Sequence, residues 1–175
     1  MFLKTIVRAL IVRPRNKIRT KYYTWRVSLQ AKELRGKLVV NGKSSVSPDT
    51  VLGHNVHFNG MRIDGGDGVF IGDNFHSGFD CLIIGAYHNY DSGTKIPYDE
   101  SYILKTVVIE DNVWLGSKVI IMGGVTIGEG AVIQAGSVVV SDIPKYSIAG
   151  GSPAKVFKTR DIAHYENLKA QGKFH

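Results

Sequence analysis

The chain has only one cysteine, Cys81, among its 175 residues, so it cannot form an internal disulfide, and this absence favours a reducing compartment. Acidic residues are also absent from the first 32 residues, which contain nine Lys or Arg. The net charge of +7 therefore arises in that segment, because the remaining residues carry thirteen Lys or Arg against fifteen Asp or Glu, a balance of −2. A slightly acidic core argues against nucleic acid as a partner.

A long hydrophobic run is missing as well. Met1–Val12 is apolar, but Lys4 and Arg8 interrupt it. It is too short to span a bilayer, and no small-residue cleavage site follows it. As a helix, it would place four apolar residues on one face: Leu3, Ile6, Val7 and Leu10. We expect Pro14 to end this helix.

A basic amphipathic arm of this kind has two alternative roles. It can lie on an anionic membrane surface, which would hold a cytoplasmic protein at the inner face of the membrane. It can equally cap the open end of a neighbouring β-structure with its apolar face. The sequence supports both roles, and we take residues 1–32 as a separate N-terminal arm.

The sequence does contain a six-residue period between Ile109 and Pro144. In sixes it runs IEDNVW, LGSKVI, IMGGVT, IGEGAV, IQAGSV and VVSDIP. The first place is always aliphatic: Ile109, Leu115, Ile121, Ile127, Ile133 and Val139. A helix needs apolar spacings of three and four, and a plain strand alternates in twos. A period of six instead predicts flat coils stacked into a parallel β-helix, and the 20 glycines suit its frequent turns.

The period is weaker on either side of this stretch. Looser hexads are present from Val39 to Ile63. The pattern restarts at Ile71-Gly72, and there it places Cys81 inside the core. Residues 86–106 have no period and are polar, aromatic and broken by Gly93 and Pro97, so we predict a loop that is extruded from the coils. We also predict a short helix from Asp161 to Lys169.

The repeat resembles that of the hexapeptide-repeat acyltransferases, and the segments GSVVVSDIP and AGGSPAKVFKTR resemble the closing part of that family. The resemblance implies an all-β fold, a left-handed parallel β-helix with three six-residue faces per coil over residues 33–160, followed by a tail with a short helix over 161–175. It also implies transfer from acetyl-CoA by a homotrimer with an active site between each pair of subunits.

Histidine is the residue type most suited to catalysis here. His54, His57 and His76 do not have the spacing of the zinc sites in related β-helix carbonic anhydrases, so no metal is expected. His88 lies where the last coil gives way to the extruded loop. In the family's sugar O-acetyltransferases, a histidine at this place is the general base, and a neutral imidazole can take a proton from a sugar hydroxyl. The HNYD sequence that begins at His88 resembles capsule and lipopolysaccharide O-acetyltransferases more than the galactoside and maltose types, which have His-Pro.

A coenzyme A site is predicted from the spacing of Ser117 and Ala135, which are 18 residues apart and third in their hexads. They should lie about 4.8 Å apart on successive coils and form a track of small side chains for pantetheine. The resemblance implies that the Ser117 amide donates to the thioester oxygen and that Ala135 contacts pantetheine. Three nearby basic residues suit the phosphates: Lys155, Lys158 and Arg160. The family's Thr-Lys pair is replaced here by Val140 and Ser141, and Ser141 remains a candidate contact.

Candidate acceptor contacts are Asp80, Tyr87, Asn89, Asp91 and Trp114. The sequence therefore favours an O-acetyltransferase that moves acetyl directly from acetyl-CoA to a carbohydrate hydroxyl of a cell-surface polysaccharide or its precursor. N-acylation of a nucleotide-linked amino sugar and acetylation of an antibiotic are alternative reactions. A non-catalytic β-helix scaffold is the alternative from another class.

Overall fold

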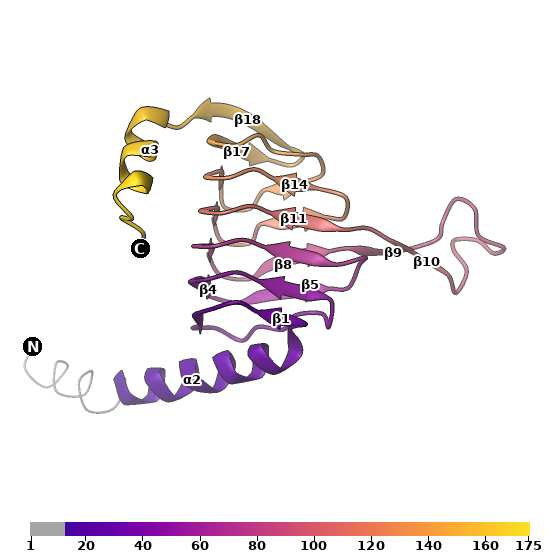
Figure 1. Ribbon diagram of the computed structural model, residues 1–175. Coiled ribbons are helices and arrows are strands. Elements are labelled where there is room, and N and C mark those ends of the chain that lie inside the picture. The colour runs from indigo at the N-terminus through magenta and orange to yellow at the C-terminus, as the bar shows by residue number, and fades with distance from the viewer. Residues whose placement is uncertain (1–12) are drawn as a thin grey trace, which may run out of the picture.

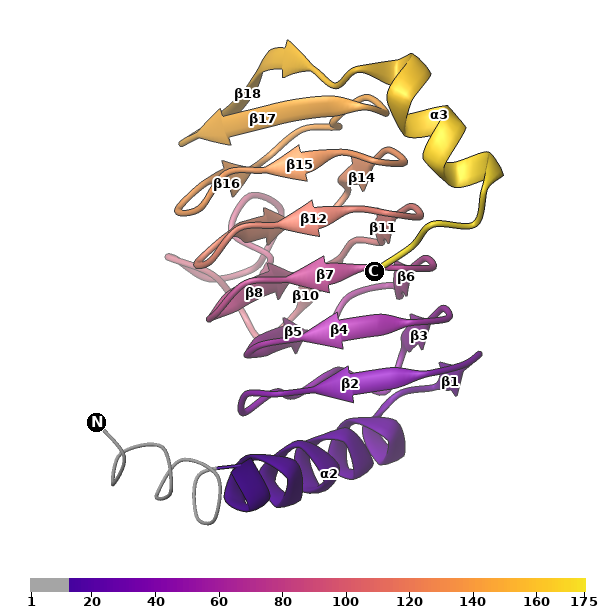
Figure 2. The same ribbon diagram turned by 90° about the vertical axis from the view of Figure 1, so that its left-hand side faces the viewer.

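The computed structural model describes residues 13–175, and most of them form one parallel β-helix with an α-helix near each end (Figure 1). In Figure 2 the front strands run from right to left while the chain rises toward its C-terminus, so the winding is left-handed. No helix among the described residues is long and apolar enough to cross a bilayer. The predicted fold class is confirmed.

Three sheets form the three faces of the β-helix, and each coil visits them in the order A, B, C. Face A contains β1 (Glu33–Leu34), β3 (Thr50–Leu52), β6 (Val69–Ile71), β11 (Val107–Ile109) and β14 (Thr126–Ile127). Face B contains β2 (Leu38–Val40), β4 (Val56–Phe58), β7 (His76–Ser77), β12 (Trp114–Leu115), β15 (Val132–Ile133), β17 (Ser147–Gly151) and β18 (Ala154–Thr159). Face C contains β5 (Met61–Asp64), β8 (Cys81–Ile84), β13 (Ile120–Met122) and β16 (Val138–Val139). Only β18 is antiparallel to its neighbour on these faces of the described chain.

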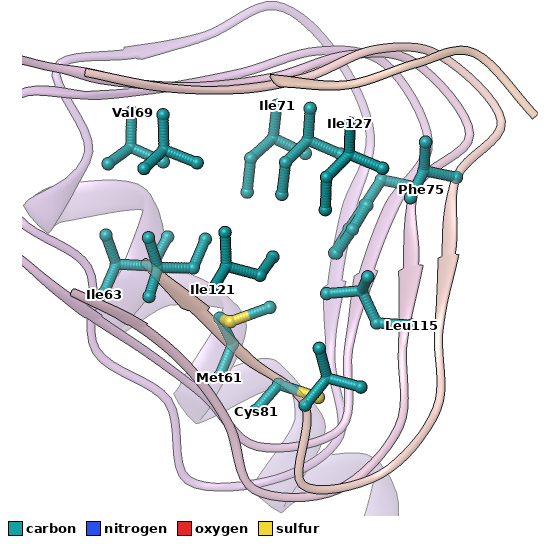
Figure 3. Packing of buried hydrophobic residues seen from close by; sticks show 14 of the residues in the cluster. Met61, Ile63, Val69, Ile71, Phe75, Cys81, Leu115, Ile121 and Ile127 are labelled. Carbon is teal, nitrogen blue, oxygen red and sulfur yellow. The ribbon is translucent and has the colours of Figure 1, made fainter. Parts of the chain in front are cut away.

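The six-residue period is the period of the core. Residues 18 apart pair in parallel register, as Leu115 does with Ile133 and Ile121 with Val139. All six first-place side chains of the repeat are at most 1% exposed. Leu115, Ile121 and Ile127 are three of them, and they point into the same narrow core (Figure 3). Cys81 is 2% exposed within this core, as predicted.

Asparagine forms the turns at the corner between faces A and B. Asn55, Asn74 and Asn112 have φ values between 53° and 59°, a left-handed conformation that asparagine tolerates better than most residues. The side-chain amide of Asn55 donates to Asn74, which donates to Asn112, each over 3.0 Å. This ladder satisfies the polar side chains of successive turns with one another.

The predicted loop at residues 86–106 leaves the β-helix, but its base is a regular hairpin. β9 (Ala86–His88) pairs antiparallel with β10 (Tyr102–Leu104), and residues 89–101 form the tip. The hairpin projects from the corner between faces C and A, opposite face B (Figure 1). From here on, the arm means residues 86–104, which are distinct from the N-terminal arm of residues 1–32.

The helix α2 (Arg13–Gln30) lies across the first coil and covers its open end (Figures 1 and 2). It contains Pro14 in its first turn, where no intrahelical N–H is needed, and the helix that we expected Pro14 to end lies outside the described residues. Val27 is fully buried against the core. The helix α2 therefore has the capping role that we predicted for the N-terminal arm. Met1–Val12, with its predicted apolar face, lies outside the described residues.

The second helix, α3 (Ile162–Ala170), lies beside the A–B corner (Figure 2) and closely matches its predicted range. Asp161 caps it by accepting a hydrogen bond from the His164 amide over 2.9 Å. Tyr165, its buried residue, donates to Glu129 over 3.1 Å. The bond from Tyr165 to Glu129 holds α3 against the β-helix.

Candidate functional site

Small residues form a column along the corner between faces B and C. A Cβ at Gly78 would lie 2.4 Å from the Ser117 nitrogen, and one at Gly116 would lie 2.4 Å from the Ala135 nitrogen. Glycine at both positions therefore lets successive turns stack backbone on backbone. Ala135 is exposed at the surface of this column. Ser117 and Ala135 therefore lie on adjacent turns of this corner, and their contact with pantetheine stays a prediction.

The amide of Ser117 is an available hydrogen-bond donor. Its hydroxyl accepts from the Phe79 amide over 3.1 Å, and its carbonyl accepts from the Gly136 amide over 2.9 Å. Its own N–H has no acceptor among residues 13–175. A fixed N–H of this kind can stabilise an oxygen that gains negative charge.

The three predicted phosphate contacts do not converge. Strand β18 runs back across face B, so Lys155, opposite Gly150, lies nearest the B–C corner, and Lys158 lies further along, opposite Ile148. Arg160 donates from Nη1 to the Gly130 carbonyl over 3.0 Å and lies 4.7 Å above the Tyr165 ring. The placement of Arg160 with the other two is wrong, because the reversal of β18 and the docking of α3 carry it to the opposite corner.

Aromatic stacking holds His88 at the base of the arm. Its ring is stacked on Tyr98, with the centroids 3.9 Å apart, and lies 4.6 Å from the ring of Tyr102. Its Nδ1 is buried and has no hydrogen-bond partner among the described residues. Packing rather than a hydrogen bond therefore orients the imidazole, and no partner in the described chain fixes its tautomer.

The neighbours of His88 shape the arm. The hydroxyl of Tyr87 accepts from the Gly123 amide. Asn89 accepts from the Ser92 amide over 3.1 Å and donates to the Ser101 hydroxyl over 3.2 Å, so its side chain organises the tip. Asp91 is exposed.

Sequence reasoning missed Asp99, Tyr98 and Tyr102. Hydrogen bonds from Ser101 and Thr94 lower the pKa of Asp99 to about 2 and keep it ionised as the organising acceptor of the tip. In the sequence, the two tyrosines can be recognised only as aromatic residues in a polar loop. The hairpin pairing, which sets Tyr102 opposite His88, is what shows their role.

The predicted site residues fall on two different edges of face C. Ser117, Ala135 and the φ-positive Asp80 lie at the B–C corner, before the face C strands. His88 follows β8, and Ser141 follows β16, so both lie at the C–A corner beyond those strands. One chain thus separates His88 from the Ser117 amide by the width of face C, roughly 15 Å for a strand of this length.

Trp114 belongs to neither group. It is 57% exposed on face B, in register with His76, and lines a groove against α3. The His76 ring stacks on His57 at 4.3 Å, and the terminal His175 lies edge-on at 4.9 Å. Burial, followed by the neighbouring His57 and His175, lowers the pKa of His76 to about 4.

No cluster of three or more His, Cys, Asp or Glu in the described part of the chain could hold a metal ion. His54, the third histidine weighed for a metal, instead pairs with Asp73, with 3.3 Å between Nδ1 and Oδ1.

Residues 106–141 match the family described as bacterial transferase hexapeptide, six repeats. A Saccharomyces cerevisiae protein, provisionally named an acetyltransferase, is 36% identical over an alignment of 115 positions, which covers 54% of this chain and 58% of that protein. The chain spans less than two thirds of the length of the curated relatives it matches.

Two solved structures share the fold over most of the chain. A galactoside acetyltransferase in complex with coenzyme A is 26% identical, with a TM-score of 0.68 over 87% of this chain and 84% of that one. A maltose O-acetyltransferase from Clostridium difficile 630 is 30% identical, with a TM-score of 0.57 over 74% and 66% of the two chains. By its repeat, its fold and these matches, the chain belongs to the hexapeptide-repeat acyltransferase family.

Proposed function

We propose that this protein transfers acetyl from acetyl-CoA to a carbohydrate hydroxyl of a cell-surface polysaccharide or its precursor, in the cytoplasm. The observation that carries the proposal is the free Ser117 amide beside an exposed column of small residues, together with a stacked histidine at the base of the arm. The solved relatives named for galactoside and maltose acetylation support the choice of a sugar hydroxyl.

The B–C corner fits the pantetheine arm of coenzyme A. Ala135 is exposed, and the close stacking of Gly116 on Ala135 leaves no side chain to obstruct the column there. Lys155 lies at the C-terminal end of the same corner and supplies a positive charge suited to a phosphate. Ser141 and Lys158 are secondary candidates for contacts with the nucleotide end.

His88 acts as the general base in this proposal. Its imidazole accepts the proton of the sugar hydroxyl as the hydroxyl oxygen forms a bond to the acetyl carbon. The Ser117 N–H donates to the carbonyl oxygen, which gains negative charge in that step. The carbon–sulfur bond then breaks, and the proton held by His88 passes to the departing thiolate of coenzyme A.

A cysteine nucleophile is not needed for this reaction. Cys81 is 2% exposed in the core, and burial raises the pKa of its thiol, so its thiolate is disfavoured and out of reach of a substrate. Direct transfer between the two bound substrates is the route that the residues support.

The active site requires two copies of the chain. His88 and Ser141 lie at one edge of face C, whereas Ser117 and Ala135 lie at the other. A neighbouring copy that brings its C–A corner to the B–C corner of the first would unite the two groups. We propose a homotrimer, in which three such contacts close a ring with three equivalent sites.

The arm provides the surface for the acceptor. Tyr98 and Tyr102 flank His88, and Tyr90 is 71% exposed nearby in the tip. Flat rings with a polar hydroxyl edge suit the mixed apolar and polar faces of a sugar. Asp91 and Asp80 are exposed carboxylates available for sugar hydroxyls.

The test is coenzyme A release from acetyl-CoA with a panel of sugars, nucleotide sugars, amino sugars and lipid-linked glycans. We expect release that depends on one class of hydroxyl acceptor and a product that has gained one acetyl group. Transfer only to an amine would replace the proposal with N-acylation. A folded protein that is not stabilised by coenzyme A in a thermal shift, and releases none, would be a scaffold instead.

A further inference from the structure

The helix α2 has an outward face that the β-helix does not use. Its inward face is occupied: Val27 is buried, Thr24 Oγ1 accepts from the Val40 amide over 3.0 Å, and Gln30 Oε1 accepts from the Val46 amide over 3.2 Å. The inward face therefore supplies acceptors for backbone donors of the first coil. Nothing in the described chain covers the opposite face.

The outward face carries an apolar stripe, which we define as Ile18, Tyr22, Trp25 and Leu29. These side chains are 70%, 50%, 58% and 68% exposed. Their spacings of four, three and four residues align them along one side of a helix. Val27 follows Ile18 by nine residues, about two and a half turns, so the stripe lies directly opposite the buried face. It therefore faces away from the β-helix at the N-terminal end of the molecule (Figures 1 and 2).

Positive charges border the stripe on both sides. Helical geometry places Lys17 and Lys21 along one side of it and Arg19 and Arg26 along the other. The helix contains no Asp or Glu. The Arg26 guanidinium lies 5.9 Å above the Tyr22 ring, so its charge is held beside the apolar surface. Such a surface is complementary to a layer that is negative outside and apolar beneath.

We propose that the stripe and its basic borders dock the protein on an anionic lipid membrane. Trp and Tyr favour the interface between lipid headgroups and acyl chains, where Ile18 and Leu29 would also bury apolar surface. The bordering Lys and Arg attract anionic headgroups. A second copy of the chain fits this face poorly, because pairing two identical helices would bring their positive borders together without an acid on either. The proposal does not depend on acetyl transfer.

Co-sedimentation of the full chain with vesicles tests the proposal. The vesicles are phosphatidylcholine alone or phosphatidylcholine with roughly a third phosphatidylserine, at low (about 0.05 M) and high (about 0.5 M) salt. We expect at least about tenfold stronger partitioning onto the anionic vesicles at low salt, with a marked decrease at high salt.

Two variants locate the surface. Trp25→Ser/Leu29→Ser, at exposed positions, should lower the partitioning at least about tenfold without changing the melting curve or coenzyme A affinity. Phe157→Ser is the matched control, since Phe157 is 57% exposed on β18, and it should bind as the unaltered chain does.

Three results would overturn the proposal. The first is equal sedimentation of the stripe variant and the unaltered chain, and the second is no binding of the unaltered chain to anionic vesicles. The third is self-association at rising concentration that the stripe variant abolishes, which would show that the stripe contacts a second copy instead of lipid.

Discussion

His88 and Ser117 lie at opposite edges of the same face of the β-helix. Ser117 belongs to the turn that enters face C, and His88 follows the strand that leaves it. In a rigid solenoid of stacked parallel strands, no side-chain rotation can close a gap of roughly 15 Å. The proposed base and the proposed oxyanion donor can therefore meet only across a contact between two copies.

Replacing His88 with alanine should leave the fold intact and lower turnover by roughly 10²–10⁴-fold, the usual size of a general-base contribution. The His88 ring packs on the arm and not in the core, so the melting curve should change little. Coenzyme A release at saturating substrate measures the effect, with His54→Ala as the control because His54 is exposed at the A–B corner. Turnover within a few-fold of the unaltered protein would remove His88 from the mechanism and direct attention to His76.

Replacing Ala135 with tyrosine should weaken coenzyme A binding at least about tenfold, because the new ring would occupy the column of small residues. Ala135 is exposed, so the fold should tolerate the change. Ala163→Tyr, at an exposed position on α3, is the matched control. Calorimetric titration with coenzyme A gives the affinities, and an unchanged value for Ala135→Tyr would move the binding track to another corner.

The capping role of α2 can be tested with two positions on opposite sides of the helix. Val27→Asp would bury an unpaired carboxylate against the core and should reduce the free energy of unfolding by about 3 kcal/mol. Leu29→Asp places the same group in solvent and should cost less than about 1 kcal/mol. Denaturant unfolding measures both, and equal losses would mean that α2 does not cap the coil in solution.

The stacked histidines on face B predict a dependence of stability on pH. The pKa of His76 is about 4 in the folded protein, below its ordinary value of 6.5, so between these values the unfolded chain binds more protons. The contribution of His76 is therefore fully present above pH 6.5 and is lost as the pH falls toward 4. The melting temperature should drop between pH 7.5 and 5, and His76→Gln should reduce that drop. An identical drop in both proteins would contradict this assignment.

The sequence predicted the β-helix because its period and the structure's period have the same cause. Each six-residue side of a coil places one large apolar residue in the core, so Leu115, Ile121 and Ile127 lie on three successive faces of the β-helix. The position of His88 at the start of an extrusion was also predictable, because the hexads stop just before it.

Contacts that depend on tertiary packing could not be predicted in this way. The inward face of α2 has only Val27 and Tyr23 packed against the core, beside polar side chains such as Thr24. The sequence pattern of this segment therefore indicates a basic N-terminal arm and gives little sign of the capping role. Strands β9 and β10 are three residues each, too short for a periodic signal. Arg160 was misplaced because nothing in the sequence shows that β18 folds back over face B.

Mixing two inactive variants tests the shared site most directly. When His88→Ala and Ala135→Tyr chains are unfolded together and refolded as mixed oligomers, some contacts pair an intact His88 from one chain with an intact Ala135 from the other. Random assembly at equal amounts should restore about a quarter of the unaltered activity, because each site draws one edge from each of two chains. Activity that stays at the level of the separately refolded variants, in oligomers shown to be mixed, would contradict the account and place the whole site within one chain.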